Sequence, residues 1–139
     1  MCYQLRRNNM PRDYCRSAIP TVYNLQDVAP YREEKGFQQV VFRGIDQIIG
    51  FSQISPEKPD SKPHTHPYEQ MNMLIEGRLD FLVNDELVEL EPYDTLAIPP
   101  EIPHTSRTVE EENATLLAFW PLREDRIEGT AYQEEFPDV

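Results

Sequence analysis

Cysteine and basic residues are both scarce in this sequence. The two cysteines, Cys2 and Cys15, do not form a closely spaced pair of the kind that binds metal ions or exchanges disulfides. We expect them to be free thiols in the reducing cytoplasm. Acidic residues outnumber basic ones by 25 to 13, which gives a net charge of −12. Because such a chain repels polyanions, we expect no nucleic-acid partner.

Long apolar runs are also missing. No stretch approaches the roughly 20 apolar residues that cross a bilayer, and the first twenty residues lack the apolar core of a signal peptide. We therefore expect no membrane partner and a cytoplasmic location. At 139 residues, 39% of them apolar, the chain has the size of one domain with a single core.

Proline is frequent and glycine is rare, with thirteen prolines against five glycines. Prolines at this spacing leave little room for long helices. A tight-turn pair, Asn84 and Asp85, separates two apolar segments and predicts a hairpin. Short segments with turn residues between them indicate an all-β fold, an antiparallel sandwich or barrel. The predicted strands cover residues 37–44, 47–55, 71–77, 78–84, 86–92, 95–100, 104–110 and 114–122.

The two ends of the chain lie outside this pattern. We expect residues 1–30 to form an N-terminal extension that is partly disordered or contacts a second subunit, and residues 124–139 to form a short acidic tail. Residues 31–123 would then form the barrel. Small barrels commonly pair through edge strands or exchanged termini, so we expect a homodimer.

Histidine occurs three times, and all three histidines lie in "PHTHPYEQMNMLIEG" (63–77) and "IPPEIPHTSRT" (98–108). On a strand, His64 and His66 would share one face about 6 to 7 Å apart, and His104 would arrive from another strand. Three imidazoles with an oxygen ligand bind a transition metal and leave positions open for water or substrate. The His-x-His pair alone is weak evidence, because neighbouring histidines are often only hydrogen bonded or solvent exposed.

Taken together, "HTHPYEQMNMLIEG" and "PPEIPH" resemble the two motifs of the cupin superfamily. The first motif maps onto Lys58, His64, His66, Gln70 and Gly77. The second motif maps onto Tyr93, Pro99, Glu101, His104 and Thr108. The resemblance covers about residues 37 to 122 and implies an antiparallel double-stranded β-helix, the cupin jelly-roll barrel. It also implies one divalent transition metal per chain, Fe, Mn, Ni or Zn, with ligands His64, His66, Gln70 and His104.

The sequence departs from the family pattern at five positions. Lys58, Tyr93 and Glu101 replace glycines, which concerns turn geometry and leaves the ligand set intact. Thr108 replaces an asparagine. Gln70 replaces the ligand glutamate, and its neutral amide would leave a divalent ion with its full charge as a stronger Lewis acid. Glu69 is the alternative fourth ligand, although strand alternation turns it to the other face.

The ligand pattern is also similar to that of small single-domain cupins that promote ring opening of unsaturated uronates. "LAFWPLRED" (117–125) resembles a segment of that subgroup, but Leu117 stands where the subgroup has an acidic residue. Tyr68 and Arg123 are candidate catalytic groups, and Asn72, Arg123 and Phe119 are candidate substrate contacts. Tyr68 and Phe119 would otherwise be packing residues, and Arg123 a rim residue paired with acids.

These features favour a metal-dependent enzyme that acts on a small polar, oxygen-rich substrate, anionic or carbonyl-containing. The expected chemistry is non-redox: isomerisation, ring opening, elimination or cyclisation. Two alternatives remain open. Three histidines with open positions also suit an Fe(II)- or Mn-dependent dioxygenase. A barrel of this kind can also serve as a non-catalytic cup that binds a small molecule or sugar.

Overall fold

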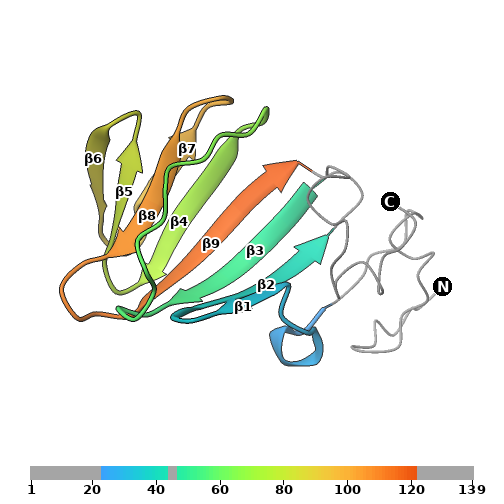
Figure 1. Ribbon diagram of the computed structural model, residues 1–139. Helices are drawn as coiled ribbons and strands as arrows, with labels where there is room; N and C mark the ends of the chain where they lie inside the picture. The colour runs from blue at the N-terminus through green and yellow to red at the C-terminus, as the bar shows by residue number, and fades with distance from the viewer. Residues whose placement is uncertain (1–22, 44–46, 122–139) are drawn as a thin grey trace.

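The computed structural model describes residues 23–43 and 47–121, which form two antiparallel sheets (Figure 1). The larger sheet has the strand order β1-β2-β3-β9-β4-β7, and the smaller one has the order β6-β5-β8. In the described residues, the 3-10 turn η2 (Leu25–Asp27) precedes them. The strands are β1 (Arg32–Glu34), β2 (Phe37–Arg43), β3 (Gln47–Ile54), β4 (Gln70–Glu76), β5 (Leu79–Val83), β6 (Glu86–Leu90), β7 (Thr95–Ile98), β8 (His104–Thr108) and β9 (Ala114–Pro121).

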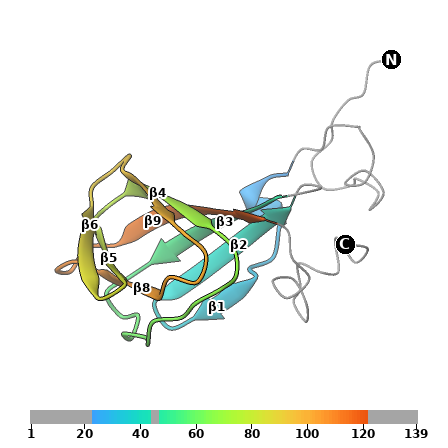
Figure 2. The ribbon, with the colours of Figure 1, turned by 90° about the horizontal axis from the view of Figure 1, so that it is seen from above.

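The two sheets enclose the core between them (Figure 2). Alternation along the strands places every second residue inside, as in β9, where Leu116, Ala118 and Trp120 are buried and the intervening Leu117 and Phe119 are only partly buried. Apolar residues from both sheets, such as Leu74 of β4 and Phe81 of β5, form one cluster. The all-β jelly roll that the sequence predicts is therefore confirmed.

All eight predicted strands are present, and so is the predicted hairpin. Asn84 and Asp85 both have positive φ, 48° and 65°, as a two-residue type I′ turn requires, and the flanking Val83 and Glu86 are paired. The strand that the sequence did not predict is β1, whose three residues are Arg-Glu-Glu. It forms because its backbone pairs with β2, and that pairing needs no apolar side chain.

The outer face of the large sheet carries two apolar rows across its central strands. Ile49 of β3, Phe119 of β9 and Met71 of β4 are in register in the first row. Phe51, Leu117 and Met73 form the second. Ile49 and Met71 are each nearly two-fifths exposed.

Most of the predicted extension and the whole predicted tail fall outside the described residues, together with Cys2, Cys15 and Arg123. Their expected roles, and the expected cytoplasmic location, stay predictions. Within the described ranges, no helix has the length and apolar character needed to span a bilayer.

Two of the substituted family glycines keep the backbone conformation of glycine. Tyr93 has φ 75° and Glu101 has φ 67°, both in the left-handed region that side chains disfavour. The positive φ at these two positions is therefore kept without glycine. Gly77 has φ 82°, and a Cβ there would overlap the carbonyl oxygen of Asn113.

We predict that Glu101→Gly stabilises the protein by about 1 kcal/mol, because it relieves left-handed strain at an exposed side chain. Gly77→Ala is the matched opposite and should destabilise it by more than about 1 kcal/mol, since it adds both strain and overlap. Urea unfolding of both variants and the wild type measures these changes. A less stable Glu101→Gly protein would contradict the interpretation.

Candidate metal centre

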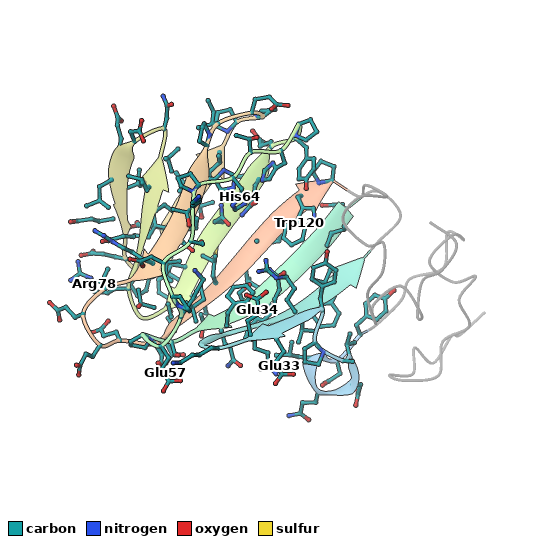
Figure 3. The ribbon with its side chains drawn as sticks, in the orientation of Figure 1. Glu33, Glu34, Glu57, His64, Arg78 and Trp120 are labelled. Carbon is teal, nitrogen blue, oxygen red and sulfur yellow. The ribbon has the colours of Figure 1, made fainter. Side chains whose placement is uncertain are left out.

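Two of the three histidines are tied together through their backbones. His104 begins β8, and His64 lies in the loop between β3 and β4, where it forms an isolated bridge with His104. Each backbone N–H donates to the other residue's carbonyl over 3.0 Å. Figure 3 shows that the labelled His64 lies in the upper half of the view, between the sheets, away from Glu33 and Glu57 at the lower edge.

The alternation that would place His64, His66 and Gln70 on one face requires a strand that continues past Pro67, and the structure has no such strand. Apart from the bridge at His64, this stretch is irregular, and β4 begins only at Gln70. Pro63 and Pro67 explain the difference, because proline has no N–H to donate to a sheet. The two histidine rings still converge, with centroids 5.9 Å apart.

Hydrogen bonds to the backbone fix the tautomer of the two buried histidines. Nδ1 of His66 lies 2.8 Å from the carbonyl oxygen of Tyr68, and Nδ1 of His104 lies 2.8 Å from that of Ile102. A carbonyl oxygen only accepts, so both Nδ1 atoms carry a proton, and in the neutral ring each Nε2 then presents a lone pair. Such backbone partners commonly orient histidine ligands of metals.

Ring packing holds His66 in place as well. The ring of Tyr68 stacks on it with a centroid distance of 4.3 Å and an interplanar angle of 6°. Tyr68 is itself buried in an apolar cluster with Ile48 and Trp120. Its placement is that of a positioning residue for His66, and its predicted catalytic role stays a prediction.

The three histidines offer ligand atoms that all lie within 4.8 Å of one another. The rings of His64 and His66 have their centroids 4.4 and 4.8 Å from that of His104. Three imidazoles this close, two of them with Nε2 lone pairs fixed, match the donor set of a divalent transition metal. The predicted histidine cluster is thus confirmed as a group positioned to bind a metal ion.

Gln70 lies beside this cluster and Glu69 does not. Oε1 of Gln70 is 3.0 Å from Nε2 of His66, whereas Glu69 is exposed and is not part of the group of ligand atoms that the three histidines form. When His66 is neutral and protonated on Nδ1, its Nε2 atom and Oε1 of Gln70 are two acceptors that face each other. A cation between the two atoms relieves their repulsion. If two ligand atoms each lie about 2.1 Å from one ion and the ligand–ion–ligand angle is a right angle, the two atoms are roughly 3.0 Å apart. The distance between Oε1 of Gln70 and Nε2 of His66 therefore suits neighbouring ligands of one ion.

Asn72 determines which end of the Gln70 amide faces the histidine. The Nε2 atom of Gln70 donates to Oδ1 of Asn72 over 2.8 Å, which leaves Oε1 of Gln70 turned toward His66. Asn72 is fully buried on β4, and its Nδ2 has no hydrogen-bond partner among the described residues. We interpret Asn72 as an orienting residue behind the ligand, and its predicted contact with substrate stays a prediction.

A cavity of about 250 Å³ opens onto the cluster, and it is lined in part by His64, Gln70 and His104. Its wall includes Leu116 and Ala118 of β9. Phe119 follows Ala118 in the sequence and points to the outer face of the sheet, so its placement does not support the predicted substrate contact. The basic lining residues Arg32, Lys58 and Lys62 were not predicted as site residues.

Comparison with known proteins agrees with this fold and site. A family model described as "Cupin domain" matches residues 50–120. The polyketide synthase CurC of Streptomyces cyaneus is 26% identical over 103 residues, which cover 70% of this chain and 67% of that protein.

Two solved structures share the fold. The polyketide cyclase RemF of Streptomyces resistomycificus has a TM-score of 0.63 at 19% identity and covers 86% of this chain and 97% of its own. KdgF of a Halomonas species has a TM-score of 0.63 at 18% identity, and the match covers 76% of this chain and 97% of KdgF.

We predict that the untagged protein purifies with about one divalent transition metal per chain, and that His104→Ala loses most of it. This variant keeps the backbone bridge to His64 and removes only the imidazole. Glu69→Ala is the control, and it should keep its metal because Glu69 is exposed. Elemental analysis by mass spectrometry provides the measurement.

Gln70→Ala should bind the metal more weakly than Glu69→Ala, and Gln70→Glu should retain it. Equal metal content in the wild type and His104→Ala would contradict the metal centre. Loss of metal in Glu69→Ala, with retention in Gln70→Ala, would make Glu69 the ligand instead.

Proposed function

Because the chain belongs to the cupin domain family, we propose that it is a metal-dependent enzyme that isomerises or cyclises a small carbonyl-containing molecule without oxidising it. The observation that carries the proposal is the meeting of three imidazoles and one neutral amide oxygen at a cavity. When bound, the divalent ion would act as a Lewis acid that polarises a carbonyl oxygen.

The residues of this chain would hold the ion and leave its charge uncompensated. His64, His66 and His104 are neutral ligands, and Gln70 contributes a neutral oxygen where the family has a carboxylate. Uncompensated charge favours the polarisation of a carbonyl group or the stabilisation of an enolate. We propose Fe, Mn, Ni or Zn as the ion.

The size of the cavity and the relatives support cyclisation or isomerisation. A volume of about 250 Å³ is that of roughly eight waters, which suits a small metabolite or the reacting end of a longer one. The names of CurC and RemF describe a polyketide synthase and a polyketide cyclase. Polyketide chains carry several carbonyl groups, and we propose a substrate of this chemical kind.

The expected homodimer stays a prediction, with a new candidate surface. The two apolar rows on the outer face of the large sheet lie across three neighbouring strands and contain no charged residue. A second copy related by a two-fold axis could place the same rows against them. A molar mass of one chain by light scattering would contradict the dimer.

We predict that the metal-loaded protein accelerates hydrogen–deuterium exchange next to the carbonyl groups of methyl acetoacetate under nitrogen. The measurement is ¹H NMR in D₂O. The control is His104→Ala, which lacks the imidazole ligand of residue 104. Exchange in the wild type should exceed that of His104→Ala by about tenfold or more. The reason is that only the intact ligand set holds the group that polarises the carbonyl.

The same probe separates the alternatives. Consumption of oxygen and probe in air, with no exchange under nitrogen, would contradict non-redox chemistry and favour an Fe(II)- or Mn-dependent dioxygenase. Saturable binding without exchange or oxygen consumption would favour a non-catalytic binding protein.

A further inference from the structure

The charged residues that line the cavity are all basic. Arg32, Lys58 and Lys62 contribute to the wall, and no aspartate or glutamate is among the lining residues. This reverses the balance of the whole chain, which has 25 acidic and 13 basic residues. The cavity is therefore a positive site in a strongly negative protein.

Lys58 is the best placed of the three. Its side chain is half-buried, and Nζ donates to the carbonyl oxygens of Pro59 and Ser106 over 3.4 and 3.5 Å. Ser106 lies two residues after His104 on β8, and residues at this spacing share one face about 6 to 7 Å apart. The hydrogen bond to Ser106 thus holds the Lys58 ammonium group beside the residue of β8 that follows His104 on the same face, and His104 is a predicted metal ligand.

A packed turn fixes the backbone of Lys58. Gly36, with φ 72°, lies so close to the backbone of Lys58 that a Cβ there would overlap its nitrogen. The N–H of Lys58 donates to the carbonyl of Ser55, and the N–H of Ser55 donates to the carbonyl of Gly36. The side chain of Lys58 therefore extends from a backbone position that is fixed by hydrogen bonds.

Among the residues that the structure describes, Lys58 and Lys62 have no acidic partner. Within the described part of the chain, neither lysine forms an ion pair. Arg32 differs, because its guanidinium lies 3.0 Å from Glu34 and 5.1 Å from the ring centroid of Phe37. Arg32 is therefore partly neutralised, and the lysines are not.

We propose that Lys58, assisted by Lys62 and Arg32, binds a carboxylate of the substrate. The inference rests on the proposed function in taking this cavity as the substrate site. With neutral ligands and a basic wall, the described lining of the cavity contains no negative group, so a negative group of the substrate would complete it.

Acetoacetate and methyl acetoacetate test this, because they share one acyl chain and differ in charge. Isothermal titration of the zinc-loaded protein should give a dissociation constant about tenfold or more lower for acetoacetate. In Lys58→Met this preference should fall toward unity while the affinity for the ester is unchanged. Lys58→Arg should keep the preference.

Lys35→Met is the matched control, because it removes the same charge from an exposed residue that does not line the cavity. It should bind both probes as the wild type does. Zinc content and thermal unfolding of each variant establish that fold and ligand set are intact. If Lys58→Met distorts the wall, the retained preference of Lys58→Arg still tests the charge.

An unchanged preference in Lys58→Met, or an equal loss in Lys35→Met, would overturn the proposal. Failure of the proposed function would give a different result. The preference for acetoacetate would persist and depend on Lys58, but neither probe would show metal-dependent hydrogen exchange.

Discussion

The site depends on the pair of backbone hydrogen bonds between His64 and His104. These two bonds join an irregular loop to the first residue of β8, so that histidines 40 positions apart in the sequence meet. Side chains alone would not achieve this, because the loop from Pro59 to Glu69 is otherwise outside both sheets. With this bridge in place, His66 is held at the same point by its hydrogen bond to the carbonyl of Tyr68, by the stacked Tyr68 ring and by the N–H of Glu101, which donates to the His66 carbonyl oxygen.

The sequence predicted the strands and the ligand cluster because both are recorded in local patterns. Apolar alternation marked eight strands, and Asn84 with Asp85 marked the hairpin. The short edge strand β1 escaped prediction because its pairing involves only backbone atoms. The irregular path of His64 to Tyr68 escaped too, because strand alternation was applied across two prolines that prevent a strand.

The basic wall could not be predicted, because it is assembled from β1 and from the loop between β3 and β4, which are distant in the sequence. Lys58 occupies a position that is glycine in the cupin motif, and the sequence showed it only as a change in turn geometry. Tyr93 and Glu101 fit that interpretation, since both keep positive φ. Lys58 differs because its side chain lines the cavity. The same departure from a motif thus concerns turn geometry at two positions and substrate charge at the third.

The most direct test of the account is ¹⁵N NMR of the imidazoles during titration of zinc into metal-free protein, which is clean because the chain has three histidines. We predict that one nitrogen of every ring shifts at about one equivalent of zinc, while the Nδ1 protons of His66 and His104 remain on their backbone carbonyls. A histidine whose nitrogens do not change at saturation would contradict the three-histidine centre.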